Sequence, residues 1–211
     1  RFAVMNPELT YTLPAYQTAC GAVDIMMHTM ERYFVPDDTL ELTDGMAEAL
    51  IRTVMHNALI LKGEPQNYKA RAEIMWAGSL AHNSLMNCGG PNGDWASHQL
   101  EHELGGMFDV AHGAGLAAVW GSWARYVFHD KPERFAQFAS RIFDIECHGN
   151  ARETALLGIE AMEEFYRSID MPTTIRELGV ALTEEQIEEL AAKCAFGGRT
   201  IGAFKTLNQE D

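Results

Sequence analysis

Apolar residues recur at helical spacing along most of this chain, and this pattern limits the folds open to it. In residues 14–34, for example, Val23, Met26 and Met30 share one face of a helix. That helix opens with Pro14, a residue suited to a first turn. Strand-like alternation is nearly absent, apart from a short stretch before Pro14. The pattern therefore predicts an all-α fold.

Further segments carry the same amphipathic period, with capping residues or prolines at their starts. Asp94 is expected to cap a helix that Gly105 and Gly106 end near Leu104, and Thr183 is expected to cap the final helix. The other segments are 41–61, 66–86, 112–129, a helix opening at Pro132, and 151–168. We therefore expect a single all-helical domain over residues 1–211, a multi-helix bundle of about seven to nine helices.

Charge and composition exclude several classes of partner. Asp and Glu number 30 against 16 Lys and Arg, so the net charge of −14 repels phosphate backbones and anionic membranes. No apolar run approaches the ~20 residues that span a membrane. Four cysteines lie far apart without a C-x-x-C pair, which is typical of a reduced, cytoplasmic protein. We expect no nucleic-acid partner and no membrane association.

Histidines are concentrated in residues 94–117, "DWASHQLEHELGGMFDVAHGAGLA". His98 and His102 are four residues apart, so one helix presents both on one face, and His112 follows the diglycine. Upstream, Asp24 and His28 form a second pair at the same spacing. Imidazoles with a carboxylate suit Fe(II) or Zn(II). Five candidates exceed what a four-coordinate site needs, which leaves one side chain for proton transfer.

Two familiar metal motifs do not fit these residues. A zincin needs glutamate directly after its first histidine, and Gln99 stands there instead. The paired E-x-x-H motifs of a di-iron bundle are also missing. The remaining histidines are expected to be structural or to lie on the surface; they are His56, His82, His129 and His148.

The chain resembles the carboxy-terminal, all-helical half of the iron-containing (group III) alcohol dehydrogenases, especially the butanol-dehydrogenase-like branch. "NPELTYTLPAYQTACGAVDIMMHTMERYF" is similar to the segment D-P-x-L-T-x-x-L-P followed by a D-x-x-x-H helix. "SHQLEHELGGMFDVAHGAGLAAVWGSW" resembles H-x-x-x-H followed ten residues later by H-G. Asn6, where the family more often has Asp, and the acidic HQLEHELGG are minor departures.

The resemblance implies roles for all five residues. Asp24, His28, His98 and His112 would bind a divalent metal, Fe2+ or Zn2+, and His102 would lie near the nicotinamide and substrate as a proton relay. The implied reaction interconverts primary alcohols and aldehydes with NAD or NADP, in a protein expected to be a homo-oligomer. Three nearby apolar residues could shape a substrate pocket or simply pack in the core; they are Met107, Phe108 and Trp120.

Family members begin with a Rossmann-like dinucleotide-binding domain, and this chain shows no strand, glycine-rich turn and helix in sequence. "NCGGPNG" lies between predicted helices, and neither end of the chain looks complete. We expect the metal-binding half alone, without the amino-terminal domain and inactive by itself. Two alternatives stay open: a helical domain that only binds metal or a partner, and a lyase relative with the dehydroquinate synthase-like plan.

Overall fold

The computed structural model describes residues 2–36, 40–147 and 149–211. Within these ranges the regular structure is helical, and the single extended pairing is an isolated bridge between Ile201 and Leu207. The helices are α1 (Ala15–Tyr33), α2 (Glu41–Gly63), α3 (Tyr68–His82), α4 (Ala96–Phe108), α5 (His112–Val127), α6 (Pro132–Phe143), α7 (Ala151–Ser168) and α8 (Glu184–Cys194), with short 3-10 turns at Pro7–Thr10, Leu85–Asn87 and Phe196–Gly198. The predicted all-α class and helix number are confirmed for this part of the chain.

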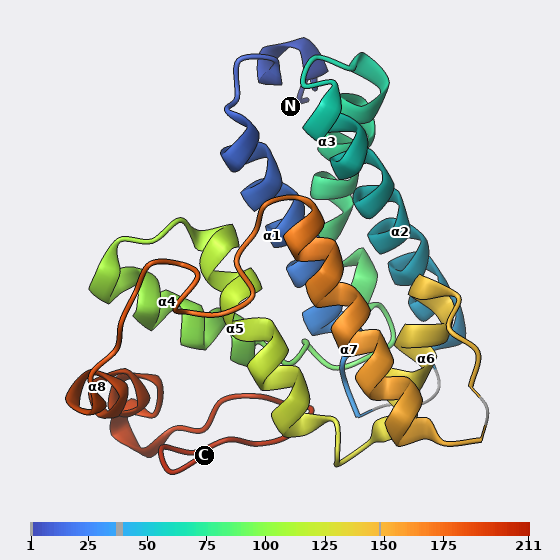
Figure 1. Ribbon diagram of the computed structural model, residues 1–211. Helices are drawn as coiled ribbons and strands as arrows, with labels where there is room; N and C mark the ends of the chain where they lie inside the picture. Colours follow the sequence, from blue (N-terminus) through green and yellow to red (C-terminus); the bar gives the residue numbers. More distant parts are fainter. Residues whose placement is uncertain (1, 37–39, 148) are drawn as a thin grey trace.

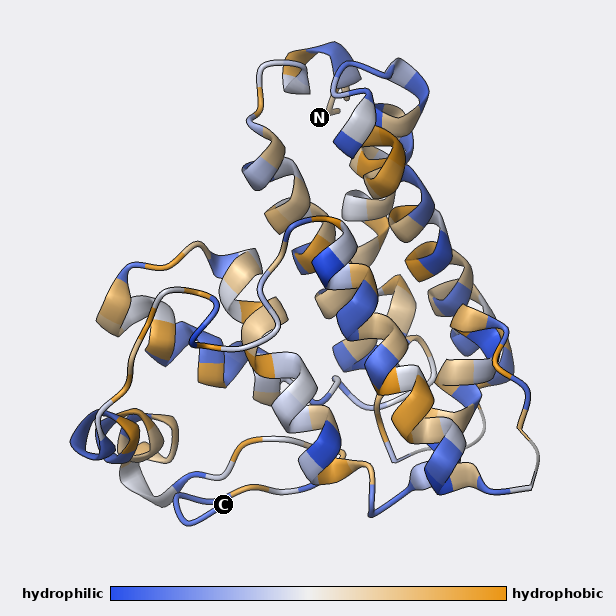
Figure 2. Cartoon of the chain, viewed as in Figure 1, coloured by the Kyte–Doolittle hydropathy of each residue, from blue (hydrophilic) through white to orange (hydrophobic). Residues whose placement is uncertain are grey.

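Helix α1 is the centre of the arrangement, because α2, α3 and α5 all pack against it. Among the other contacts, α6 packs against α7, α2 against α3, and α4 against both α5 and α8 (Figure 1). Hydrophobic and hydrophilic residues alternate around the turns of α2 and α7 (Figure 2), as expected for helices with one buried face. No helix of the described ranges is both long enough and apolar enough to cross a membrane.

Aromatic side chains fill the core beneath α1. The rings of Phe34 and Phe135 stack with centroids 4.3 Å apart. Trp120 is fully buried and lies between Phe138 and Tyr166. Trp120 is therefore a core residue rather than part of a substrate pocket, which decides between the two predictions made for it.

Three local expectations are wrong. Helix α4 continues through Gly105 and Gly106 to Phe108, because both glycines keep helical backbone angles and Asp109 takes the left-handed conformation that ends the helix. Helix α3 stops at His82 instead of continuing to residue 86, since Ser84 has a positive φ of 67°. The strand-like stretch before Pro14 contains a 3-10 turn.

Asp94 fixes the start of α4 against the C-terminal segment. One carboxylate oxygen accepts a hydrogen bond from the Ala96 N–H (3.1 Å), although the N-cap position itself falls on Trp95. The other oxygen accepts from the N–H groups of Ala203 and Phe204, both at 2.7 Å. The side chain is buried, so this one residue satisfies three backbone donors from two distant segments.

Replacing Asp94 with alanine should lower the free energy of unfolding by about 2–4 kcal/mol, since buried N–H groups lose their acceptors. Asp130→Ala is the matched control, because Asp130 faces the same C-terminal segment only through an exposed ion pair with Lys205. Urea unfolding followed by circular dichroism measures both variants. Equal losses in the two variants would contradict the role given to Asp94.

Candidate metal centre

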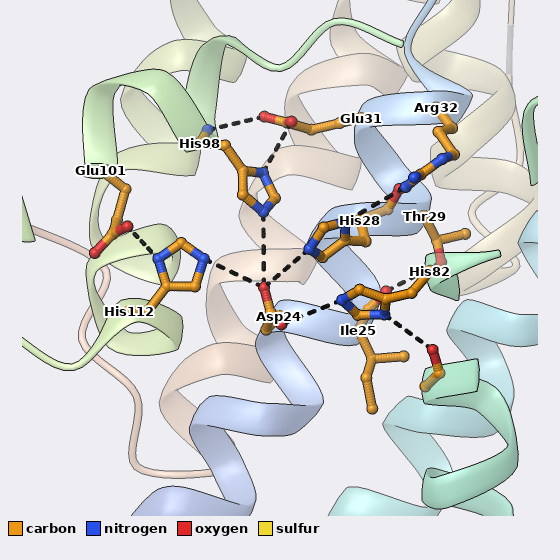
Figure 3. Close-up of polar contacts among 11 residues, drawn as sticks. Asp24, Ile25, His28, Thr29, Glu31, Arg32, His82, His98, Glu101 and His112 are labelled. Carbon is orange, nitrogen blue, oxygen red and sulfur yellow. Dashed lines mark hydrogen bonds and ion pairs between the residues drawn. The ribbon is translucent and has the colours of Figure 1, made fainter. Parts of the chain in front are cut away.

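The carboxylate of Asp24 faces four imidazoles, three of them through one oxygen atom (Figure 3). Its Oδ1 atom lies 3.5 Å from Nε2 of His28, 3.6 Å from Nε2 of His98 and 3.4 Å from Nε2 of His112. Asp24 and His28 come from consecutive turns of α1, His98 from α4 and His112 from the first turn of α5. The structure thus brings together the four residues predicted as ligands from the sequence.

A glycine allows α5 to begin close enough to α1. A Cβ atom added to Gly113 would lie 2.1 Å from the Cys20 carbonyl oxygen, a distance no side chain tolerates. Cys20 lies one turn before Asp24 on α1, so this close approach brings the neighbouring His112 to Asp24. Gly115 is constrained less severely, since its Cβ would lie 2.7 Å from the Glu101 side chain. Close backbone approach explains the glycines around the histidines.

Two buried glutamates orient two of the imidazoles. Glu31 accepts hydrogen bonds from both the backbone N–H (3.1 Å) and ring Nδ1 (2.9 Å) of His98. Glu101 accepts from Nδ1 of His112. Each glutamate is only 2% exposed. With the proton held on Nδ1, the lone pair of Nε2 points toward Asp24 in both rings, as a metal ligand requires.

The electrostatics of the centre favour added positive charge. Burial acts to raise the pKa of Asp24, but the contacts with His112 and His98 outweigh it and hold that pKa below its ordinary value. The contacts of His112 with Asp24 and Glu101 raise its pKa to about 10. Burial lowers the pKa of His28 to about 4. Without a cation the carboxylates therefore raise the pKa of His98 and His112, so that protons compete with a metal ion for these two rings.

The atoms at the middle of the centre are better placed to bind a cation than to hydrogen-bond to one another. Oδ1 of Asp24 and Nε2 of His98 are buried and have no hydrogen-bond partner. Their separation of 3.6 Å exceeds a good hydrogen bond, yet both can reach one ion at about 2.0–2.2 Å. Three imidazole nitrogens and one carboxylate oxygen are a donor set for Zn2+ or Fe2+.

His102 lies beside this group. Its side chain is exposed on α4, and its ring is 5.4 Å from that of His112 and 6.0 Å from that of His98, measured between centroids. It does not face Asp24 as the other three rings do. The exposed side chain thus lies at the edge of the centre, and with Glu101 and His112 it forms a second cluster of possible ligands beside that of Asp24, His28 and His98.

One of the remaining histidines is closer to the centre than expected. His82 lies on the surface, as predicted, but its Nε2 is 3.7 Å from Oδ2 of Asp24 and its ring is 3.9 Å from that of His28. His56 and His129 are exposed and belong to neither cluster of possible ligands. The prediction for His148 lies outside the described residues.

Sequence reasoning missed the two glutamates that orient the rings. Glu101 lies between the two histidines of "HQLEH", and Glu31 three residues after His28 in "HTMERY". Their helical spacing could have placed both glutamates near the histidines. It could not show which side chain faces which ring, because Glu31 and His98 belong to different helices.

Comparison with known proteins gives one consistent result. The sequence profile of the Fe-containing alcohol dehydrogenase family, C-terminal, matches residues 18–211. The chain is 35% identical over 212 residues to a probable NADH-dependent butanol dehydrogenase 1 of Bacillus subtilis (strain 168), covering 100% of this chain and 54% of that protein. It is also 35% identical over 179 residues to the NADPH-dependent aldehyde reductase YqhD of Escherichia coli (strain K12), covering 85% of this chain and 46% of that protein.

A solved structure agrees with these sequences. The crystal structure of an NADH-dependent butanol dehydrogenase A from Thermotoga maritima matches with a TM-score of 0.90 and 35% identity, over 97% of this chain and 52% of that one. The chain thus spans about half the length of the relatives it matches. Fold, histidine spacing and sequence agree, and the chain belongs to the Fe-containing alcohol dehydrogenase family, whose C-terminal part it represents.

Proposed function

We propose that Asp24, His28, His98 and His112 bind one divalent cation, Fe2+ or Zn2+, in the metal half of an NAD(P)-dependent dehydrogenase for primary alcohols and aldehydes. The observation that carries the proposal is the convergence of three Nε2 atoms on one carboxylate oxygen, each 3.4–3.6 Å away. The substrate class is supported by the relatives, which are named as butanol dehydrogenases and an aldehyde reductase.

The protein side chains divide the chemistry between them. A bound divalent cation would polarise an alcohol or aldehyde oxygen. Glu31 and Glu101 hold two rings in the ligating orientation, so the centre is organised before the cation arrives. The reaction also moves a proton, and His102 is the imidazole at the open edge of the site that can carry it to solvent.

The hydride has to pass to or from a nicotinamide, and we propose that the domain binding this cofactor lies outside this chain. The relatives are nearly twice as long as the part they share with it. Residues 88–93 form a loop between the 3-10 turn at Leu85–Asn87 and α4, so no strand precedes this glycine-rich segment. A helical domain that binds metal without catalysing a reaction remains the alternative, and the assays below separate the two.

Replacing Glu31 with glutamine should weaken Zn2+ binding about 10–100-fold, the usual cost of losing an orienting partner. The amide can accept one hydrogen bond from His98, where the carboxylate accepts two. Isothermal titration of residues 1–211 with Zn2+ measures the change. Glu153→Gln, at an exposed position in the first turn of α7, is the control and should bind as the unaltered chain does.

Alanine substitutions of His102 and His98 should have different effects in the full-length polypeptide that we propose, in which a nucleotide-binding domain is joined to this chain. His102→Ala should keep its metal and lose turnover, because a proton carrier typically contributes 10²–10⁴-fold. His98→Ala should lose metal and activity together. Metal content and the rate of butanol oxidation with NAD+ or NADP+ are measured for both variants. Loss of metal from His102→Ala would show that the two roles have been exchanged.

Residues 1–211 alone should neither oxidise butanol nor bind NADH. Hydride transfer needs the nicotinamide held within a few ångströms of the substrate carbon, and one wall of that site is proposed to be elsewhere. NADH fluorescence during titration with the chain measures binding. Saturable, micromolar binding would place the cofactor site within this chain and overturn the proposed division into two domains.

A further inference from the structure

The three imidazoles of the centre do not have equivalent partners behind them. Glu31 faces Nδ1 of His98, and Glu101 faces Nδ1 of His112. Nδ1 of His28 instead faces the guanidinium group of Arg32, with Nη1 at 3.4 Å (Figure 3). A glutamate accepts the proton on Nδ1, whereas a guanidinium group has only donors. The environment of His28 is therefore the opposite of that around the other two rings.

Arg32 is held firmly in this position. Its Nη1 donates a hydrogen bond to the His28 carbonyl oxygen at 2.6 Å, and the residue is 8% exposed. The ring of Trp95 covers the guanidinium group, with the centroid 4.6 Å from Cζ. Trp95 itself has a positive φ of 66°, and its indole N–H is bonded to the Asn92 carbonyl oxygen at 2.5 Å. Arg32 cannot easily turn away from His28.

Tautomerism gives this contact a chemical consequence. A neutral imidazole that binds a cation through Nε2 must carry its proton on Nδ1. In His98 and His112 that proton meets a carboxylate. In His28 it would meet the N–H of Arg32, so two donors would face each other at 3.4 Å with no acceptor between them. The arrangement with the proton on Nε2, directed to Asp24, is favoured instead.

We infer that Arg32 weakens His28 as a ligand, so that His28 is the exchangeable member of the four and can be displaced while the ion stays bound. The inference rests on the metal site proposed above and goes beyond it by ranking the ligands. Asp24, His98 and His112 would hold the ion. Arg32 acts as a positioning residue, through His28 and without touching the ion.

Two neutral substitutions of Arg32 test this with Co2+ as the probe. Arg32→Gln places an amide oxygen one helical turn from His28, where it can accept the Nδ1 proton. Arg32→Met removes the same charge but offers no acceptor. Because both variants lose one positive charge, the difference between them isolates the hydrogen bond. We expect Arg32→Gln to bind Co2+ about 10-fold more tightly than Arg32→Met, measured by titration and by the visible absorption of the bound ion.

The difference should require His28. In a His28→Ala background, Arg32→Gln and Arg32→Met should bind Co2+ equally, whereas a purely structural effect of residue 32 would persist. Equal affinity of the two variants when His28 is present would overturn the inference and leave the metal site standing. Failure of the unaltered chain to bind Co2+ at all would overturn the metal site and the inference with it.

A second measurement does not depend on residue 32. His28→Ala should retain Co2+, and His112→Ala should lose at least about ten times more affinity, because the ring removed there is already oriented by Glu101. Both histidines are accessible enough for replacement without loss of the core, with side chains 18% and 40% exposed. Equal losses in the two variants would contradict the ranking.

Discussion

The contact on which the rest of the site depends is that between Asp24 and three imidazole nitrogens. Asp24, Glu31 and Glu101 gather three carboxylates in a small volume, and Arg32 is the guanidinium group within it. Carboxylates that share a partly buried site repel one another, and this repulsion is costly unless a cation accompanies them. A cation bound at the proposed site would both neutralise this charge and join α1, α4 and α5.

Packing prepares the same three helices for that contact. The backbone of α5 lies against α1 at Gly113, and Asp94 bonds the start of α4 to the C-terminal segment. Neither residue is itself a predicted ligand. Each restricts the movement of a helix that carries His98 or His112 relative to Asp24. A metal site needs its ligands placed with sub-ångström precision.

Spacing within a helix allowed the helices and the two i, i+4 pairs to be predicted, whereas the roles expected of the five candidate residues came from the family resemblance. Asp24 with His28, and His98 with His102, are neighbours four residues apart in any α-helix. The parts that could not be predicted are contacts between helices, such as Glu31 with His98 and His82 with Asp24. The diglycine misled for a different reason: Asp109, and not a glycine, is the left-handed residue that ends α4.

Arg32 affects the centre in two ways, through its charge and through its effect on the orientation of His28. Together these effects explain how a single site can contain both firm and exchangeable ligands. The guanidinium group offsets part of the carboxylate charge, so a divalent ion is enough to neutralise the centre. It does so from behind one ring, where it denies His28 the acceptor that Glu31 and Glu101 give the other two. A third glutamate there would strengthen His28 and leave the centre more negative. One arginine thus lowers the charge of the site and loosens one ligand, and Trp95 keeps it in the place where it does both.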